Sequence, residues 1–472
     1  MLFNTGTFFI FLALVLLLYY ALPHRAQNRM LLGASYVFYG WWDWRFLGLL
    51  AASTVIDWML GLIIGAARDR GDAAAAKRAI VGSVVVNLGI LACFKYFNFF
   101  VDGAEQLLRA FGYDGSTWTL RIILPVGISF YTFQSMSYTI DIYRGELRAS
   151  RSLVDFALYV AFFPQLVAGP IERATRLLPQ VQRPRLVTAV DWEEGLLLLG
   201  LGLFRKVAIA DPAGSIADVY FANPAAHTSV QLVAGVLLYA LQIYNDFAGY
   251  SDMARGTARL MGFSLMRNFH HPYFATSFSD FWKRWHISLS GWLRDYLYIP
   301  LGGNRHGRLR TQLNLMITML LGGLWHGANW TFVVWGALHG LYLVAQHAWS
   351  GLAPRVATRP PWMRTALHVA AAVVVFALVN LAWIFFRAPD FATAFAYVGG
   401  IAALTPGAEG GLIPLAVLGL YTLAIDVPQA RADNEYVFLE WPVARRALAT
   451  TAAAVVFLGS GTTDAPFIYF QF

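Results

Sequence analysis

Charged residues are scarce in this sequence of 472 residues, because they make up 13% of the chain while 58% of its residues are hydrophobic. A soluble globular domain carries about 25% charged residues. The mean hydropathy of this chain is +0.53. The composition therefore excludes a soluble enzyme and a disordered chain, and it indicates a helical membrane protein that crosses the bilayer several times.

Cysteine is almost absent, since Cys93 is the single one in the sequence. An intrachain disulfide and a metal site built from several cysteines are thereby excluded. Cys93 lies in an apolar run, and we expect its side chain to be buried as a small hydrophobic group. The formal net charge is +8. In a membrane protein such an excess indicates loop arginines that set topology, so we expect no nucleic-acid partner.

Long apolar runs occur throughout the chain. A transmembrane helix needs roughly 20 apolar residues, so residues 1–472 are expected to form one all-α integral-membrane domain with about eleven or twelve spans. The first run, within Met1–Tyr20, has no basic segment before it and is expected to be a retained helix. The further candidate spans are 30–41, 45–66, 79–101, 121–143, 191–211, 228–250, 311–327, 331–349, 366–386, 411–426 and 447–462.

Proline and glycine interrupt two apolar stretches, at Pro125–Gly127 and at Phe163–Gln165. We expect residues 153–171 to form a re-entrant hairpin. Irregular backbone at membrane depth is stable only where protein or a cavity covers it, so the sequence predicts a cavity lined by protein.

Arginine and lysine cluster in alternate loops. Cytoplasmic loops carry an excess of these residues, and the alternation predicts that both termini lie outside the cytoplasm. The loops assigned to the cytoplasm are 24–29, 68–78, 144–151, 173–185, 255–310, 355–364 and 431–446.

The longest weakly apolar stretch, residues 255–310, carries most of the polar chemistry. Ser277 followed by Asp280 resembles a helix capping box, with Asp in place of Glu or Gln. The helix predicted after it has an apolar face with basic residues elsewhere around it, a pattern typical of an interfacial anchor at the lipid headgroups. That apolar face consists of Phe281, Trp285, Leu289 and Trp292.

Two histidines are candidate catalytic residues. His326 lies in an otherwise apolar predicted span, where an ionisable side chain is costly and indicates a function. The alternative is a neutral histidine bonded to a helix carbonyl. Gly322, Gly323 and Gly327 around it allow either the close approach of a ligand or simple helix packing. His286 lies among tryptophan and arginine residues and has no evident anchoring role.

A group of basic side chains in the same stretch suits a phosphate-bearing ligand on the cytoplasmic side, since guanidinium groups bind phosphate oxygens well. The alternative is the ordinary positive charge of cytoplasmic loops, which is the expectation for Arg308 and Arg310. The candidate ligand-binding residues are Lys283, Arg284, Arg294 and Arg305.

Four acids are candidates for a proton or ion relay, although such acids more often pair with nearby cations. Pairing is the expectation for Asp280 and Asp295, which lie close in sequence to arginines. The four acids are Asp246, Asp252, Asp280 and Asp295. His270 and His271 lack a third metal ligand at a suitable spacing, so we interpret them as loop residues and expect no metal.

Several motifs occur in order, and together they resemble the membrane-bound O-acyltransferase (MBOAT) superfamily. The resemblance is greatest to its bacterial branch that acetylates secreted polysaccharides, and it extends over nearly the whole chain. The motifs are Trp285–Ser290, Arg294–Tyr296, Pro300–Arg305, Gly322–Gly327 and Phe163–Ile171.

The resemblance implies a fold with re-entrant segments around a central acyl-transfer pore and acetyl-CoA as the acyl donor. His326 matches the invariant histidine of the family, and His286 matches its second position, a His or Asn further upstream. We expect His326 to act as a general base, because a histidine with a pKa near 6.5 takes up a proton at neutral pH. His286 is expected to orient reacting groups or to stabilise the oxyanion.

The end of the chain resembles the F-x-Y-x-x-F motif of polymer-acylating systems, with Phe467, Tyr469 and Phe472 at the matching positions. The resemblance implies that Tyr469 is a covalent acyl carrier on an extracytoplasmic tail, residues 463–472. The alternative is an aromatic belt at the membrane interface.

The expected function is transfer of acetyl from cytoplasmic acetyl-CoA across a bacterial inner membrane, for O-acetylation of an alginate-like exopolysaccharide. The expected partners are membrane lipids, the polysaccharide, and an extracytoplasmic acetyl-accepting or SGNH-like acetyltransferase protein. Alternative acceptors are cellulose, peptidoglycan, a lipid or a protein. From another class, a proton-coupled secondary transporter would use His326 and the acids as a relay. Such transporters often have repeated halves, and we find no repeat in this sequence.

Overall fold

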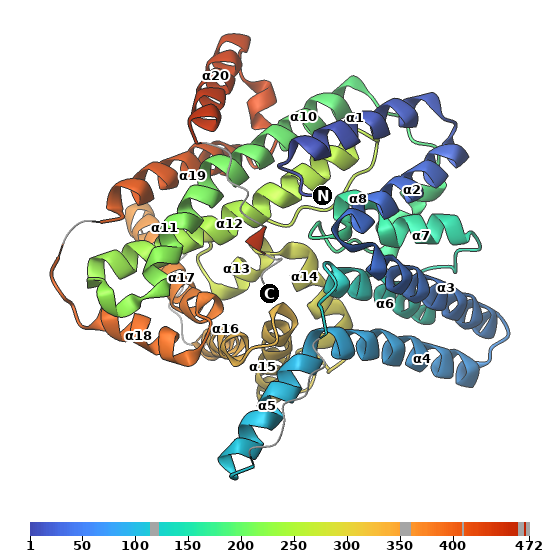
Figure 1. Cartoon of the computed structure of the whole chain (residues 1–472), viewed down its shortest axis with the longest axis horizontal. Coiled ribbons are helices and arrows are strands. Elements are labelled where there is room, and N and C mark those ends of the chain that lie inside the picture. Colours follow the sequence, from blue (N-terminus) through green and yellow to red (C-terminus); the bar gives the residue numbers. More distant parts are fainter. Residues whose placement is uncertain (114–121, 350–359, 408–409, 461–466, 469–472) are drawn as a thin grey trace. The chain divides into compact units, whose positions relative to one another are not determined.

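The computed structural model of this chain describes residues 1–113, 122–349, 360–407, 410–460 and 467–468. Within these ranges every regular element is a helix (Figure 1), so the all-α prediction is confirmed. Five helical segments of the described chain are long and apolar enough to cross a membrane, and the span count of the sequence prediction is not established. These segments are His24–Asp69, Ala73–Ala110, Ser229–Arg259, Pro361–Arg387 and Leu412–Ala432.

Most of the long helices coincide with predicted apolar runs, whereas helices such as Ala174–Gln182 and Phe391–Ala402 lie outside them. The chain divides into two compact units. The first unit comprises residues 1–199 and 253–266. Its helices are α1 (Gly6–Ala21), α2 (His24–Asp43), η1 (Trp44–Phe46), α3 (Leu47–Asp69), α4 (Ala73–Leu91), η2 (Ala92–Tyr96), α5 (Phe97–Ala110), α6 (Ile128–Arg144), α7 (Leu153–Ala161), α8 (Phe163–Leu166), α9 (Ala174–Gln182) and most of α10 (Ala189–Phe204).

A buried acid joins α3, α4 and α6 in the first unit. The Asp57 carboxylate accepts a hydrogen bond of 2.7 Å from the Ser83 hydroxyl and one of 2.8 Å from the Asn87 amide. The Ser83 hydroxyl lies 2.8 Å from that of Thr139 on α6. Hydrogen bonds of this kind hold helices together in a bilayer, where water is not present to compete for them.

The two predicted interruptions are confirmed. Gly127 adopts φ +76° immediately before α6, and a Cβ there would lie 2.7 Å from the Leu166 carbonyl oxygen. Between α7 and α8 the helix breaks at Phe162, and the side chains of both short helices are largely buried. The irregular backbone of residues 153–171 is therefore covered by protein, as its polar groups require.

Cys93 departs from the expectation. Its side chain is exposed, so the prediction of a buried residue is wrong. It lies on η2, within the segment Ala73–Ala110, whose apolar side chains are mostly exposed. An apolar residue on such a segment faces the surface that lipid would cover, and apolarity alone does not distinguish this surface from the protein core.

The second unit comprises residues 200–252 and 267–472. Its helices are η3 (Arg205–Ala210), α11 (Asp211–Ala222), η4 (Pro224–Ala226), α12 (Ser229–Arg259, ending in the first unit), η5 (Pro272–Phe274), α13 (Phe278–Arg284), α14 (Ile287–Leu293), η6 (Arg294–Tyr298), α15 (Gly307–His326), α16 (Trp330–Trp349), α17 (Pro361–Arg387), α18 (Phe391–Ala402), α19 (Leu412–Ala432), η8 (Val437–Glu440) and α20 (Val443–Gly459).

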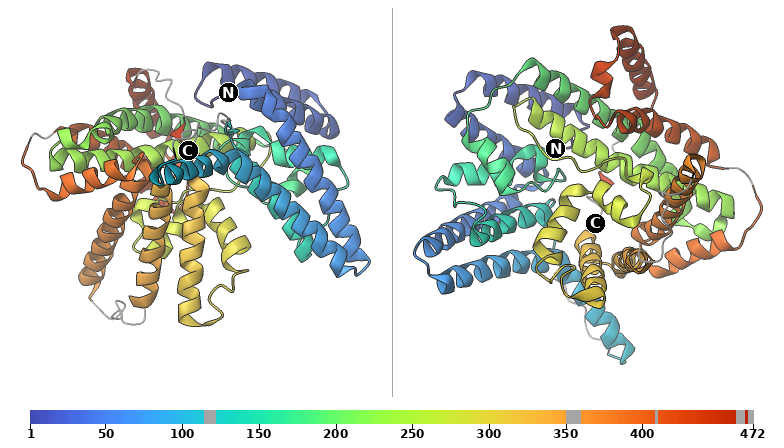
Figure 2. Two further views of the ribbon diagram at one scale, coloured as in Figure 1. Left: turned by 60° about the horizontal axis from the view of Figure 1, so that its bottom comes forward. Right: turned by 180° about the vertical axis from the view of Figure 1, so that it is seen from behind.

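In the second unit α15, α16 and α17 lie side by side (Figure 2). The close approach of α15 to α16 depends on glycine. A Cβ on Gly323 would overlap the Phe332 carbonyl oxygen, and a Cβ on Gly336 would overlap that of Met319. Small residues let membrane helices pack this closely. Gly323 therefore serves helix packing, and it lies one turn before His326 on the same helix.

Candidate active site

His286 lies in a break between two short helices. Ser277 caps α13 by accepting a 3.1 Å hydrogen bond from the Asp280 amide, so the predicted cap is confirmed. The helix then ends at Arg284, and His286 adopts φ +43° before α14 begins at Ile287. The expectation of one helix running through these positions is therefore wrong. The left-handed backbone turns the chain at His286, and histidine adopts this conformation more readily than most residues.

The predicted apolar face is buried in protein. Phe281, Trp285 and Leu289 are each 1% exposed, and Trp292 is 6% exposed. The Phe281 ring stacks on that of Trp285 with centroids 5.6 Å apart. An interfacial anchor keeps such side chains at the lipid headgroups, so the anchor interpretation is wrong for these four residues.

The two candidate histidines come together although their helices are separated in sequence. The His286 and His326 ring centroids lie 6.3 Å apart. Both side chains are buried, with exposures of 0% and 5%. The Trp325 indole lies 5.9 Å from the His286 ring and 5.0 Å from the His326 ring, so one aromatic group contacts both.

Aromatic rings surround this histidine pair. His326 meets Trp335 at 5.0 Å and Phe386 at 5.2 Å, both edge to face. His286 meets Phe247 at 4.6 Å, also edge to face. Burial lowers the pKa of the His286 imidazole to about 3, so its ring is neutral at pH 7. A neutral imidazole keeps an unprotonated nitrogen that accepts a proton or a hydrogen bond.

The third catalytic candidate, Tyr469, lies outside the described residues, as does Phe472. The two residues before Tyr469 are described, and both are buried. Phe467 stacks on Tyr250 with centroids 4.6 Å apart and contacts Phe247 at 5.9 Å. Phe247 therefore contacts the C-terminal segment on one side and His286 on the other.

The four candidate ligand-binding cations lie on the surface or partly exposed. Lys283, Arg294 and Arg305 are exposed, and Arg284 is half-buried. The Arg284 guanidinium pairs with Asp280 at 2.8 Å, and that of Arg294 pairs with Asp295 at 2.6 Å. These pairs confirm the expected pairing of Asp280 and Asp295. Lys283 and Arg305 form no ion pair in the part of the chain that the structure describes.

His270 and His271 both lie beside acids. His270 Nε2 is 3.2 Å from Asp433, and His271 Nδ1 is 3.6 Å from Asp426. Among the residues that the structure places, we find no group of three or more His, Cys, Asp or Glu side chains arranged to hold a metal ion.

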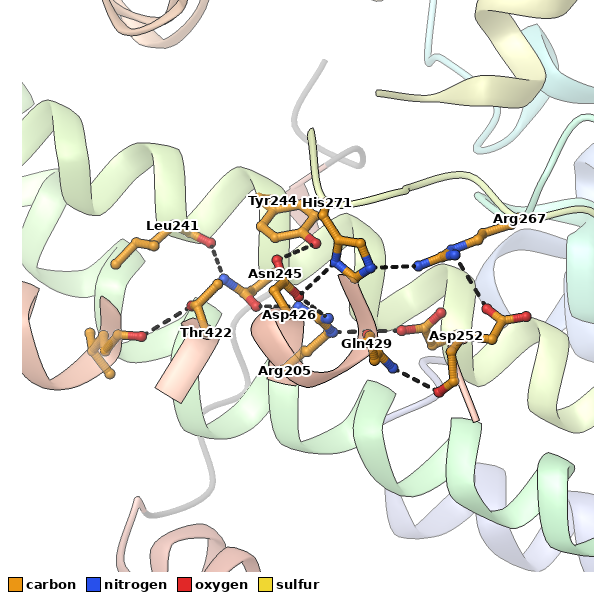
Figure 3. A network of polar contacts seen from close by, with 12 residues as sticks. Arg205, Leu241, Tyr244, Asn245, Asp252, Arg267, His271, Thr422, Asp426 and Gln429 are labelled. Carbon is orange, nitrogen blue, oxygen red and sulfur yellow. Dashed lines mark hydrogen bonds and ion pairs between the residues drawn. The ribbon is translucent and has the colours of Figure 1, made fainter. Parts of the chain in front are cut away.

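A buried polar network centred on Asp426 is absent from the sequence predictions (Figure 3). The Asp426 carboxylate accepts a hydrogen bond of 2.6 Å from Arg205 and one of 2.8 Å from the Tyr244 hydroxyl. Arg205 also donates to Asn245 at 3.0 Å and lies 3.6 Å from Asp252. Asp252 thus pairs with a cation, and its presence here favours pairing over the relay interpretation.

The neighbouring residue forms a second buried group. The Lys206 ammonium lies 2.7 Å from Asp211 and 2.9 Å from Asp246. Arg205 and Lys206 are successive cations within the predicted span 191–211. Charges at membrane depth are rare and are paired when present, so these two residues are the sequence signal for the two buried networks.

Known proteins resemble this chain over most of its length. A family model described as "MBOAT, membrane-bound O-acyltransferase family" matches residues 144–386, which include His286 and His326. The "Probable alginate O-acetylase AlgI" of Azotobacter vinelandii is 48% identical over 398 residues, covering 84% of this chain and 77% of the relative. The protein of the same description in Pseudomonas putida is 41% identical over 504 residues, covering 100% of both chains.

A third relative is named for a different acceptor. The "Peptidoglycan O-acetyltransferase" of Helicobacter pylori is 36% identical over 437 residues, covering 86% of this chain and 80% of the relative. The resemblance inferred from the motifs is therefore confirmed by a family model and by relatives that span most of the chain. The chain belongs to the membrane-bound O-acyltransferase family and is an O-acyltransferase with apolar helices fit to cross a membrane several times.

Proposed function

We propose that this protein transfers acetyl groups from cytoplasmic acetyl-CoA across the bacterial inner membrane, for O-acetylation of a secreted polysaccharide. The observation that carries the proposal is the buried pair His286 and His326, enclosed by aromatic rings within the family-matched region. The relatives named as alginate O-acetylases favour an alginate-like polymer, and the one named for peptidoglycan makes that polymer the second candidate.

In the proposed reaction His326 acts as general base. A hydroxyl, that of Tyr469 in our assignment, loses its proton to the imidazole as its oxygen attacks the thioester carbonyl carbon. The new carbon–oxygen bond replaces the carbon–sulfur bond, and the leaving thiolate of CoA takes the proton from the imidazolium. The pKa of an unperturbed tyrosine phenol is about 10, so it needs a base to become a nucleophile at neutral pH.

His286 is assigned to orient the reacting groups or to donate to the oxyanion. Its ring is held by the break between α13 and α14 and by the Phe247 edge, so its position is fixed before substrate arrives. Preorganised donors of this kind stabilise developing charge more than mobile ones do. The surrounding aromatic rings exclude water, and this strengthens each electrostatic contact with the reacting atoms.

The phosphates of CoA are assigned to Lys283, Arg284, Arg294 and Arg305. Lys283 and Arg305 are exposed without an acidic partner in the described chain, which suits a charged ligand that arrives from water. The acetyl group then passes to an extracytoplasmic acceptor, which we assign to an SGNH-like or other acetyl-accepting partner. We assign the C-terminal segment to the outer side on the basis of the distribution of loop arginines.

The alternative of a proton-coupled transporter has less support. Its relay would need titratable groups inside the membrane, and Asp246 and Asp426 are each within 3 Å of a buried cation. Ion pairing is the ordinary way in which a protein keeps a buried charge, so these acids need no relay to account for them. Membership of the acyltransferase family also supports the enzyme.

The test uses purified protein in detergent incubated with acetyl-CoA. We expect release of CoA and an acetyl group on the C-terminal peptide, detected by mass spectrometry, and His326→Ala should abolish both. The matched control is His368→Ala, which changes an exposed histidine on α17 and should retain both. CoA release without a Tyr469 adduct would retain the enzyme and remove the carrier. Full polymer acetylation by His326→Ala in cells would overturn the assignment of the base.

A further inference from the structure

A buried triad lies on the α12 side of the active site and joins three elements. Lys206 is on η3, Asp211 begins α11, and Asp246 is on α12. The three side chains are 5%, 3% and 2% exposed in their ion pairs. An unpaired charge in such a position is expensive, so the triad is kept by mutual neutralisation.

In the triad one ammonium group pairs with two carboxyl groups. A donor from the C-terminal segment adds to this group, because the Ile468 main-chain N–H donates a 2.6 Å hydrogen bond to Asp246 Oδ2. The other oxygen, Oδ1, is the one that pairs with Lys206. Lys206 therefore fixes the carboxylate from one side while the C-terminal segment binds it from the other. Hydrogen bonds to an ionised acceptor are the strong ones.

Phe467 and Ile468 are inserted among buried side chains. Phe467 is 2% exposed and Ile468 is 1% exposed, although they lie close to the end of the chain. Phe467 stacks on Tyr250, one turn along α12 from Asp246. The same helix supplies Phe247, which contacts both Phe467 and His286. One turn of α12 thus binds the C-terminal segment and forms a wall of the histidine site.

We infer that Asp246, held in place by Lys206, is a positioning residue that fixes Phe467 and Ile468 beside the histidine pair through the Ile468 main-chain N–H. Tyr469 is the residue that follows Ile468 in the sequence. Its use as an acyl carrier rests on the proposed function, whereas the docking of Ile468 does not. Because the donor is a main-chain group, any residue except proline supplies it at position 468.

The docking is tested by the accessibility of position 468. In a Cys93→Ser background, Ile468→Cys places the only thiol at a position that is 1% exposed and retains the main-chain N–H. We expect a membrane-impermeant maleimide to label this thiol slowly. Adding Asp246→Ala should raise the labelling rate about 10- to 100-fold, the factor expected for loss of a hydrogen bond to a charged group. Equal labelling rates with and without Asp246→Ala would overturn the inference.

A matched control separates this effect from a general loss of stability. Asp218→Ala removes an acid that pairs with Arg387 on the surface of the same unit, with Asp218 55% exposed. It should leave the labelling rate unchanged. Asp246→Asn keeps an oxygen acceptor and should give a labelling rate between that of the Cys93→Ser/Ile468→Cys protein and that of the same protein with Asp246→Ala. If Asp246→Ala does not fold, Asp246→Asn carries the measurement, and a rate equal to that of the Cys93→Ser/Ile468→Cys protein would then refute the inference.

A double-mutant cycle tests whether the hydrogen bond acts in the reaction. Asp246→Ala and Ile468→Pro each remove one partner, and each should lower CoA release. The double variant should lose no more activity than the more severe single variant, because both remove the same contact. Independent, multiplicative losses would overturn the positioning role.

The same variants separate this inference from the carrier proposal. Full acetylation by Tyr469→Phe, together with faster labelling of the Ile468→Cys thiol when Asp246→Ala is added, would remove the carrier and retain the docking. Loss of acetylation in Tyr469→Phe with labelling that does not depend on Asp246 would retain the carrier and remove the docking.

Discussion

Replacing Gly323 by alanine tests whether the close packing of α15 on α16 places His326. A Cβ at position 323 would overlap the Phe332 carbonyl oxygen and lie 3.2 Å from the Gly336 backbone. Main-chain atoms cannot move aside as a side chain can, so the two helices must separate. Overpacking of this kind costs about 1–3 kcal/mol.

Gly322→Ala is the matched control for this substitution. A Cβ there would meet the Leu293 Cδ1 methyl at 3.3 Å, and that methyl is the flexible end of a side chain. The two variants add the same atom to the same helix at consecutive positions. We expect Gly322→Ala to change the free energy of unfolding by less than about 1 kcal/mol, which is the scale of the Gly-to-Ala difference in helix propensity.

The assay measures thermal unfolding in detergent and the rate of CoA release from acetyl-CoA. Gly323→Ala should have the lower midpoint temperature of the two variants. Its rate should fall on the order of 10- to 100-fold, because His326 lies one turn further along α15 and a shift of about 1 Å at a reacting group has effects of that size. If Gly323→Ala and Gly322→Ala have the same midpoint and the same rate, the reasoning from glycine packing is refuted.

Three further predictions concern charge. Burial lowers the folded-state pKa of His286 to about 3, below the usual value of about 6.5. Between these two pH values the unfolded chain binds more protons than the folded chain. The free energy of unfolding therefore falls as the pH drops below about 6.5. At pH 5 the loss of stability amounts to about 2 kcal/mol. His286→Asn should reduce this loss, measured as unfolding midpoints over a series of pH values. If the midpoints of His286→Asn and of the wild type depend on pH in the same way, the prediction is contradicted. Asp426→Ala removes the carboxylate that pairs with the buried Arg205 and should lower the free energy of unfolding by about 3–5 kcal/mol. The surface substitution Asp218→Ala should lower it by less than about 1 kcal/mol. Both are measured by unfolding in detergent. Lys283→Ala and Arg305→Ala should raise the KM for acetyl-CoA several-fold with little change in kcat, and a fall in kcat alone would argue against phosphate binding.

Hydrophobic runs were sufficient to place most of the long helices, because a membrane helix needs about 20 apolar residues. Shorter helices such as α9 and α18 lie outside these runs. The cap at Ser277 is also a local signal, since its donor lies three residues away. The break at His286 has no such signal. Apolar residues continue at helical spacing through Trp285 and Leu289, and only packing against other helices shows that the backbone turns between them.

The pairing of buried charges could not be read from local sequence. Arg205 and Asp426 are 221 residues apart, and their contact depends on the tertiary fold. Arg205 and Lys206 lie within the predicted span 191–211 and in none of the loops assigned to the cytoplasm, and the structure buries both. By contrast, the family motifs already single out His286 and His326, because histidines within apolar or aromatic sequence are rare enough to be noticed.

The distance in sequence between Arg205 and Asp426 has a consequence for biosynthesis. A ribosome that adds about 5–20 residues per second needs roughly 10–45 s to proceed from one to the other. During this interval the guanidinium has emerged while its partner at 2.6 Å has not been made. Asn245 and Asp252 are made earlier and are the partners available to Arg205 until α19, one of the last apolar helices, supplies Asp426 and completes the network.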